Sequence, residues 1–251
     1  MLSLEGRVAL VTGGGRGIGR AISAMFAQVG AKVAVNYRTN EAAATQTVEA
    51  IRAAGGTAVA LPGDVSRAED AGRLVTETEA RLGPLDVLVV NHGIWQRAPI
   101  ETMTPDQWDE TLRVNLRGAY AVCHHASRVM IPRGRGAIVI IASTAGERGE
   151  PCYSHYAASK GALLAFTKSL AAELAVHGIR VNAVSPGWVL TDMTRDTFSG
   201  PDAAEVLAAI PLGRPGTPEE IAGPVVFLAS DLASYLYGEV LCVNGGAVMA
   251  E

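Results

Sequence analysis

Short runs of consecutive apolar residues, rich in valine and isoleucine, alternate along the chain with longer segments in which apolar positions recur every three to four residues. Uninterrupted apolar runs are typical of strands that are buried on both faces of a sheet. They predict seven strands, at residues 8–12, 32–36, 58–61, 87–91, 137–142, 180–184 and 240–243. The amphipathic segments predict helices, among them 17–30, 41–54, 67–82 and 156–177.

Turn and cap residues support several of these boundaries. Gly30, Gly83 and Gly178 stand where helices are expected to end. Ser66 and Thr217 each precede acidic residues and are predicted to cap the helices that follow. Strands alternating with helices predict a single-domain, Rossmann-type α/β fold over residues 1–251, a doubly wound parallel sheet of about seven strands with helices on both faces. In such a sheet ligands bind beyond the carboxyl ends of the strands, so the functional site is expected there.

Composition narrows the class of protein. The 251 residues are 49% hydrophobic and 18% charged with a net charge of −4, which excludes a disordered chain. No apolar run approaches the roughly 20 residues of a membrane span, and no basic run favours a nucleic-acid partner. The N-terminal residues lack the pattern of a signal peptide, which predicts a cytoplasmic protein. Cys123, Cys152 and Cys242 are scattered without metal-ligand spacing, so no metal site is predicted.

A glycine-rich turn follows the first predicted strand, with the sequence TGGGRGIG from Thr12 to Gly19. Gly13 permits a tight turn, while Gly17 and Gly19 allow a backbone and a helix N-terminus to approach a pyrophosphate. A glycine triplet by itself also fits a plain strand-to-helix loop. Its position in the first βαβ unit favours a dinucleotide site.

The end of the second predicted strand indicates which dinucleotide is bound. No acidic residue stands there to accept a hydrogen bond from a ribose 2′-hydroxyl, as an NAD site requires. Arg16 and Arg38 are instead suited to pair with a 2′-phosphate. NADP(H) is therefore favoured as the cofactor, and NAD(H) is the alternative. The alternative for the two arginines is that they are solvated surface residues without a role in binding.

A candidate catalytic set lies in the middle of the chain. Tyr156 and Lys160 are four residues apart, on one face of a predicted helix. Ser143 follows the strand 137–142, and Asn115 begins or interrupts another helix. Each residue alone is ordinary, because a helix tyrosine and a surface lysine would give the same spacing. Their combination behind a nucleotide turn favours catalysis.

The whole chain resembles the short-chain dehydrogenase/reductases. It carries their TGxxxGxG turn, their Asn, Ser and YxxxK residues, Pro186-Gly187 after the sixth strand and the ending Asn244-Gly245-Gly246. The resemblance implies that Tyr156 is the general acid in reduction and the general base in oxidation. It implies that Lys160 holds the nicotinamide ribose and favours the phenolate, that Ser143 binds the substrate oxygen and that Asn115 supports a water leading to Lys160.

The same resemblance implies a cofactor site. Its residues would be Gly13, Arg16, Gly17, Ile18, Gly19, Arg38, Asp64, Val65, Asn91, Gly93, Tyr156, Lys160, Pro186, Gly187, Val189 and Thr191. The chain departs from the family at His92, where the family has a small residue. We expect this imidazole to point outward; the alternative is that it crowds the cofactor. Tyr153 lacks a lysine four residues later and is expected to line the pocket or to be structural.

The subgroup that the chain resembles most is the bacterial 3-oxoacyl-[acyl-carrier-protein] reductases. This resemblance implies NADPH-dependent reduction of 3-oxoacyl thioesters carried on acyl carrier protein or CoA, in fatty acid biosynthesis. The helix after YxxxK lacks the basic residue that often faces the carrier, and Arg133 and Arg135 are candidates to replace it. The alternatives are an NAD(P)-dependent dehydrogenase of a sugar, polyol or other secondary alcohol, and a nucleotide-binding regulator without turnover.

Two further expectations concern loops and assembly. Residues 191–212 are expected to form a substrate lid in which Phe198 helps to set specificity. Trp95 and Trp188 either narrow the pocket or pack a loop. The segments 112–130 and 156–175 carry little charge and many small apolar residues, so part of their surface is expected to meet another subunit. The resemblance implies a homotetramer built on these two helices.

Overall fold

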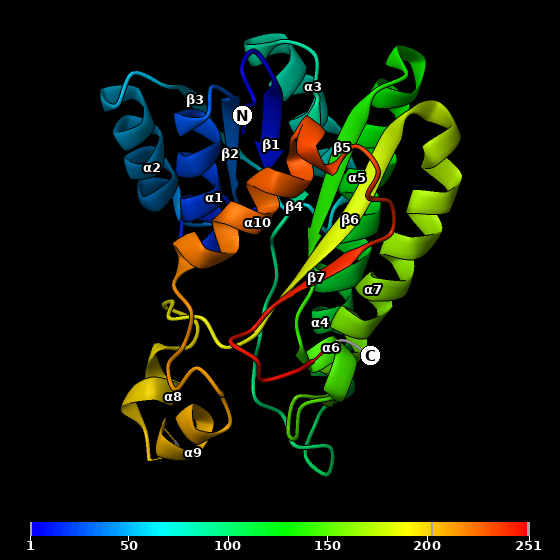
Figure 1. Cartoon of the computed structure of the whole chain (residues 1–251). Coiled ribbons are helices and arrows are strands. Elements are labelled where there is room, and N and C mark those ends of the chain that lie inside the picture. The colour runs from blue at the N-terminus through cyan, green and yellow to red at the C-terminus, as the bar shows by residue number, and fades with distance from the viewer. Residues whose placement is uncertain (1, 202, 250–251) are drawn as a thin grey trace.

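Seven parallel strands form one sheet at the centre of the molecule (Figure 1). The structure, a computed structural model, describes residues 2–201 and 203–249. The sheet order is β3-β2-β1-β4-β5-β6-β7. The strands are β1 (Val8–Val11), β2 (Lys32–Tyr37), β3 (Thr57–Pro62), β4 (Val87–Val90), β5 (Gly136–Ile141), β6 (Ile179–Pro186) and β7 (Val240–Val243). The predicted single-domain, doubly wound parallel sheet is confirmed.

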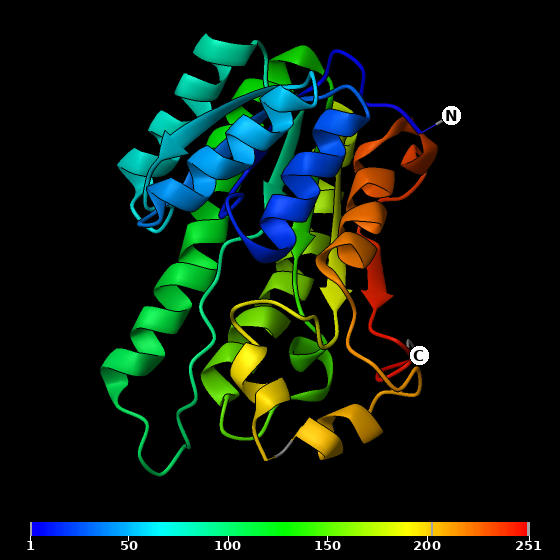
Figure 2. The same ribbon diagram turned by 90° about the vertical axis from the view of Figure 1, so that its left-hand side faces the viewer.

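Helices cover both faces of the sheet (Figure 2). One face carries α1 (Gly17–Gln28), α2 (Glu41–Ala53) and α10 (Pro218–Ala229), and its core centres on Ile22, Phe26 and Val225. The other face carries α3 (Ala68–Leu82), α5 (Gly118–Met130) and α7 (Ser154–Leu174). Because both faces are covered, β1, β4 and β6 are buried along their whole length. This double burial explains the uninterrupted apolar runs in the sequence.

The remaining helices are short and lie toward the carboxyl ends of the strands. They are α4 (Pro105–Leu112), α6 (Ala145–Arg148), α8 (Arg195–Ser199) and α9 (Ala203–Ala208). In Figure 1, α8 and α9 project beyond the sheet at the end where the strands finish. The helices α8 and α9 occupy half of the segment 191–212 that the sequence indicates as a lid, in which residue 202 lies outside the described residues.

The predicted helix boundaries are mostly confirmed. Gly30, Gly83 and Gly178 have φ angles of +94°, +108° and +67° at the ends of their helices. Thr217 forms a capping box with Glu220 at the start of α10. The prediction for Ser66 is wrong, because Arg67 is the residue before α3. The Ser66 hydroxyl donates instead to the Asp64 carboxylate at 2.6 Å.

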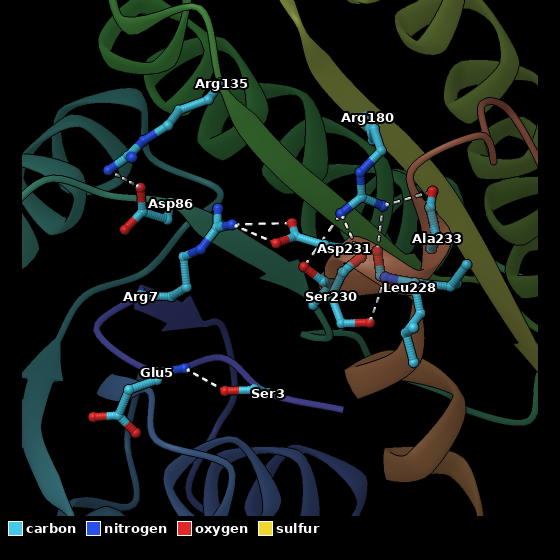
Figure 3. A network of polar contacts seen from close by, with 12 residues as sticks. Ser3, Glu5, Arg7, Asp86, Arg135, Arg180, Leu228, Ser230, Asp231 and Ala233 are labelled. Atoms are coloured by element: carbon cyan, nitrogen blue, oxygen red, sulfur yellow. Dashed lines mark hydrogen bonds and ion pairs between the residues drawn. The ribbon is translucent and has the colours of Figure 1, made fainter. Parts of the chain in front are cut away.

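A buried arginine holds the end of α10 to the sheet. Arg180, at the start of β6, is 8% exposed, and its guanidinium donates to the backbone carbonyls of Leu228, Ala229, Ser230 and Ala233 (Figure 3). Leu228 and Ala229 end α10, and their carbonyls have no partner within the helix, because the last turn of a helix leaves its acceptors free. Ser230 and Ala233 belong to the turn that follows. Arg180 therefore satisfies two of the free acceptors of α10 and binds the turn after it with one side chain.

The strand order reverses at the carboxyl edge between β1 and β4. The chain moves outward from β1 to β2 and β3 and then returns to β4 on the other side of β1. The connections that leave β1 and β4 therefore diverge, which is the arrangement that binds ligands in open α/β sheets. Asn91 joins the two strand ends, because its side-chain amide donates to the carbonyls of Thr12 and Gly13 at 3.0 and 3.1 Å.

Among the described residues, no helix is both long and apolar enough to cross a membrane.

Candidate active site

The glycine-rich turn leaves the N-terminus of α1 open. Arg16 occupies the N-cap position without a side-chain hydrogen bond, and the first turn contains no acidic residue. By contrast, Asn40, Thr104 and Thr217 cap α2, α4 and α10 with their side chains. The free N–H groups and the positive end of the α1 dipole are available to an anion. This end of the helix fits a pyrophosphate.

Glycine is required at Gly19 by close approach of the backbone. A Cβ atom there would collide with the Gly13 carbonyl oxygen and would lie 2.6 Å from the Asn91 amide nitrogen. Gly13 and Gly17 have φ angles of +61° and +49°, which glycine adopts without strain. The side chain of Thr191 lies against Gly17, since a Cβ there would be 3.4 Å from the Thr191 methyl carbon. The expected lid therefore begins over the glycine-rich turn.

The predicted adenosine end of the site is held by charged groups. Burial opposes ionisation of Asp64, but hydrogen bonds from the Ser66 hydroxyl and N–H and the charges of Arg113 and Arg38 lower the pKa of this carboxyl. Arg113 also pairs with Glu110 at 2.7 Å. The sequence gives no signal for Arg113, because it reaches Asp64 from another element, the π-helical turn before α5. Arg16 and Arg38 are both exposed at this side of the molecule.

Two of the predicted cofactor residues point their side chains into the protein. Val65 is 5% exposed and belongs to the core under α3 and α5. Ile18 packs against the core that contains α1 and α10. These two positions can therefore present backbone rather than side-chain atoms to a cofactor.

Asn115 sits in a π-helical turn, Arg113–Arg117, that interrupts the helix between α4 and α5. Its side-chain oxygen accepts from the Ile94 N–H at 2.8 Å, and its amide donates to the Ile94 carbonyl at 3.0 Å. The amide also donates to the Ser159 hydroxyl at 3.0 Å, and Ser159 donates to the Tyr156 carbonyl at 2.7 Å. Asn115 therefore fixes the chain after β4 against the start of α7. π-helical turns are frequent at functional sites.

Tyr156, Lys160 and Ser143 meet at the carboxyl ends of β4 and β5. The Lys160 ammonium is 4% exposed, donates to the Ile141 carbonyl at 2.7 Å and lies 5.8 Å from the centre of the Tyr156 ring. Burial lowers the pKa of Lys160 to about 8. Burial and the charge of Glu150 raise the pKa of Tyr156 to about 12, although the Ser143 hydroxyl opposes the increase.

Gly93 lies beside this group. A Cβ atom on it would be 3.3 Å from the Asn115 side-chain oxygen and 3.8 Å from the Lys160 nitrogen. The structure therefore brings together Asn115, Ser143, Tyr156, Lys160 and Gly93. At neutral pH the pKa values leave Tyr156 as a neutral phenol, which can donate a proton, beside a largely charged Lys160.

The expectation for His92 is wrong, because its ring points inward. Nδ1 lies 2.9 Å from the Thr12 hydroxyl, and Nε2 is buried against Gly118. A Cβ on Gly118 would lie 2.7 Å from Nε2, so the imidazole occupies space that a larger residue on α5 would fill. Burial, with a smaller effect of the Lys160 charge, lowers the pKa of His92 to about 3 and keeps the ring neutral.

The segment after β6 lies at the carboxyl edge of the sheet. Pro186 ends the strand, and Gly187 lies so close to Asn244 that a Cβ would be 2.7 Å from the Asn244 Cβ. Val189 forms an isolated parallel bridge with Gly216, and the Leu190 N–H donates to the Gly216 carbonyl at 2.9 Å. This bridge joins the two ends of the expected lid.

Four aromatic rings gather at the mouth of the site. Trp95 stacks on Tyr153 with ring centres 4.4 Å apart and planes 6° from parallel. Trp188 meets Trp95 edge-on at 5.9 Å, and Phe198 of α8 meets Trp188 edge-on at 5.8 Å. We call these four residues the aromatic wall. Its contacts join residues far apart in the chain, which the sequence could not predict.

Arg133 and Arg135, the candidates for contacting an acyl carrier, lie at the opposite edge of the sheet from the catalytic residues. Both residues precede β5, and both bind the Asp86 carboxylate, at 3.4 and 3.1 Å (Figure 3 shows Arg135). Asp86 precedes β4. All three residues therefore lie at the amino edge of the sheet, whereas Ser143 follows the carboxyl end of β5.

Over residues 2–201 and 203–249, no group of three or more His, Cys, Asp or Glu side chains is arranged to hold a metal ion.

Comparisons with known proteins identify the family. A family model described as enoyl-(acyl carrier protein) reductase matches residues 13–248. The chain is 40% identical over 250 residues to a 3-oxoacyl-[acyl-carrier-protein] reductase from Synechocystis, covering 99% of this chain and 100% of that protein. It is also 40% identical over 248 residues to an L-rhamnose 1-dehydrogenase (NAD(P)(+)) from Sphingomonas, covering 98% of each.

Solved structures agree with this result. A gluconate 5-dehydrogenase from Burkholderia cenocepacia in complex with NADP and tartrate superposes with a TM-score of 0.94 at 37% identity, covering 100% of this chain and 98% of that one. The protein therefore belongs to the short-chain dehydrogenase/reductase family and is an NAD(P)-dependent oxidoreductase.

Proposed function

We propose that the protein interconverts a carbonyl compound and a secondary alcohol with NADP(H), using Tyr156 as the group that exchanges the proton. The observation that carries this proposal is the cluster of buried Lys160 and Asn115 with partly buried Tyr156 and Ser143, next to a helix N-terminus that fits a pyrophosphate. When bound, the nicotinamide supplies or accepts the hydrogen that is transferred with its electron pair.

The proposed roles follow from the protonation states. Tyr156 donates its proton to the carbonyl oxygen in reduction and removes the alcohol proton in oxidation. A charged Lys160 nearby stabilises the phenolate that remains after donation, and it holds the ribose next to it. The Ser143 hydroxyl donates to the substrate oxygen, where negative charge develops. Asn115 is a positioning residue, because it holds Ile94 and Ser159 rather than the reacting atoms.

NADP(H) is the proposed cofactor. The N-terminus of α1 would hold the pyrophosphate, Asp64 and Asn91 would flank the adenosine, and Gly187, Val189 and Thr191 would border the nicotinamide. Arg16 and Arg38 would pair with the 2′-phosphate. Support comes from their exposure, from the absence of an acid at the end of β2, and from the NADP in the Burkholderia relative.

Two substrate classes are supported by relatives. A 3-oxoacyl thioester is the class acted on by the Synechocystis relative, as its name states. A free sugar is the second candidate, supported by the L-rhamnose relative and by the position of Arg133 and Arg135 away from the site. We also propose that residues 191–212 form the lid, because the bridge between Val189 and Gly216 holds the two ends of this segment together and allows α8 and α9 to move as a unit.

A screen of NADP(H)-linked turnover tests this function. The purified protein is assayed for NADPH oxidation with acetoacetyl-CoA, an acyl-carrier-protein thioester and a quinone, and for NADP⁺ reduction with aldoses and polyols. We expect turnover with members of one carbonyl or alcohol class. Binding of NADPH without turnover of any of them would favour a nucleotide-binding regulator and would contradict the proposal.

A homotetramer is proposed as well. Its support is a groove of about 830 Å³ along the outer surface of α4, the π-helical turn and α5, beside which Tyr120 is 55% exposed. Light scattering should give four times the chain mass of 26.1 kDa at micromolar concentration. A monomer at that concentration would contradict it.

A further inference from the structure

The aromatic wall is not explained by packing of the core. The chain has few aromatic residues, 5% in all, yet four rings meet here. Trp95, Tyr153, Trp188 and Phe198 are each partly exposed, and none of them belongs to either hydrophobic core cluster. Large apolar rings that stay accessible at a site usually contact a ligand.

The wall is tied to the segments that carry the catalytic and cofactor residues. Trp95 follows Ile94, whose backbone is held on both sides by Asn115. Tyr153 lies three residues before Tyr156, at the N-cap position of α7. Trp188 directly follows Gly187. The wall therefore borders the place where a substrate oxygen would meet Tyr156 and Ser143.

The wall is also preorganised. The Ala98 N–H donates to the Cys152 carbonyl at 2.9 Å, which joins the segment of Trp95 to that of Tyr153. Cys152 is the one residue other than glycine with a positive φ among the described residues, at +66°. Such a conformation persists only where the surroundings impose it. The stacked pair is thus set before any substrate arrives.

We propose that Trp95 and Trp188 select a free, ring-shaped sugar as the substrate, a refinement that rests on the function proposed above. A sugar ring has C–H groups on its faces and hydroxyl groups around its edge. Its faces can pack on indole rings, while its hydroxyls reach Ser143, Tyr156 and solvent. Rigid aromatic rings bind such a compact molecule at a low entropy cost, because few side-chain rotations are frozen.

A thioester on acyl carrier protein requires different surroundings. An acidic carrier needs cations beside the mouth of the site. Arg133 and Arg135 lie at the opposite edge of the sheet and are bound to Asp86. On the lid, Arg195 is paired with Asp192 at 2.7 Å. Arg97, however, is exposed two residues after Trp95 and contacts Cys152 beside the wall. The choice of a free sugar therefore rests on the rings of the aromatic wall.

The three tryptophans of the chain allow a binding test that does not depend on turnover. Trp108 lies on α4 and is not one of the four wall residues, so Trp108→Phe leaves Trp95 and Trp188 as the only indoles. Titration of this variant in the Tyr156→Phe background with NADP⁺ and L-rhamnose, followed by other aldohexoses, should change its fluorescence saturably. A fluorescence that responds to none of these sugars would overturn the proposal.

The kinetics of a variant in the aromatic wall provide a second test of the sugar proposal. Trp95→Ala should raise the KM for the best sugar about tenfold, the change that corresponds to losing about 1.4 kcal/mol of binding energy. NADPH affinity should be unchanged, which also shows that the variant is folded. Trp95→Phe keeps a ring and should stay within about twofold of the wild type, and Trp108→Phe is the matched control.

The outcomes separate this inference from the function on which it rests. Faster turnover of acetoacetyl-CoA than of every sugar would contradict the selection of a free sugar, but it would still support the proposed oxidoreductase function. An equal loss of sugar and acetoacetyl-CoA turnover in Trp95→Ala would also remove it, because a general structural effect would then explain the result. Absence of NADP(H)-linked turnover with both classes would contradict the proposed function itself.

Discussion

Lys160 provides a residue-scale prediction for pH dependence. Burial depresses its pKa to about 8, so its charge is present below that pH and is lost as the pH rises through it. Tyr156, with a pKa near 12, still holds its proton over that range. Because reduction needs both the phenol proton and the positive charge, kcat/KM for reduction should be constant at neutral pH and fall through about pH 8. A profile that stays flat to pH 10 would show that the Lys160 charge is not required.

Arg38 provides the prediction for cofactor choice. Its guanidinium is exposed, and its charge helps to lower the pKa of Asp64 at the adenosine end. If it pairs with the 2′-phosphate, Arg38→Ala should weaken NADPH binding about tenfold or more, the cost of one charge-assisted hydrogen bond. NADH binding should not change. Arg81→Ala, an exposed substitution on α3, is the control, and equal losses for both cofactors would contradict the assignment.

At the scale of elements, Arg180 should be a large contributor to stability. Arg180→Met leaves the carbonyls of Leu228 and Ala229 at the end of α10 without a donor, removes a second donor from those of Ser230 and Ala233, and should lower the free energy of unfolding by roughly 3 kcal/mol. Urea unfolding measures this change. The matched control is Arg7→Met, whose partner Asp231 is 85% exposed, and it should cost less than about 1 kcal/mol.

If Arg180→Met and Arg7→Met lowered the free energy of unfolding by similar amounts, the buried contacts of Arg180 with the carbonyls would add nothing to stability. Turnover at low temperature should survive in both variants, because Arg180 begins β6 at the amino edge of the sheet, away from Tyr156.

The sequence predicted elements best where one physical cause dominated. All seven strands were located within two residues. The central strands β1, β4 and β6 are buried on both faces, which demands continuous apolar runs. The cap of α3 was predicted wrongly, because the Asp64 carboxylate lies two residues before Ser66 and accepts its hydroxyl. For the π-helical turn around Asn115, the sequence predicted only that a helix begins or is interrupted there. The residue types of a π-helical turn do not differ from those of an α-helix.

At the scale of the whole molecule, some parts of the candidate site could be predicted from the sequence and others could not. The glycine turn and the Tyr156–Lys160 pair are local in sequence, so their proximity could be predicted from spacing. The direction of His92 depended on Gly118, which lies on another element. The aromatic wall joins four segments, and the position of Arg133 and Arg135 depends on which edge of the sheet they meet. Such long-range relations require the tertiary structure.

The central proposal is that Tyr156 transfers the proton, with Lys160 5.8 Å from the centre of its ring and Asn115 held to its backbone through Ser159. Replacement of Tyr156 by Phe removes only the hydroxyl that exchanges the proton. NADP(H)-linked turnover and NADPH affinity should therefore be measured on the same preparations of the wild type and Tyr156→Phe. We expect turnover to fall at least about a hundredfold, as for loss of a general acid, while NADPH affinity stays within about twofold. Turnover in Tyr156→Phe equal to that of the wild type would contradict the proposed chemistry.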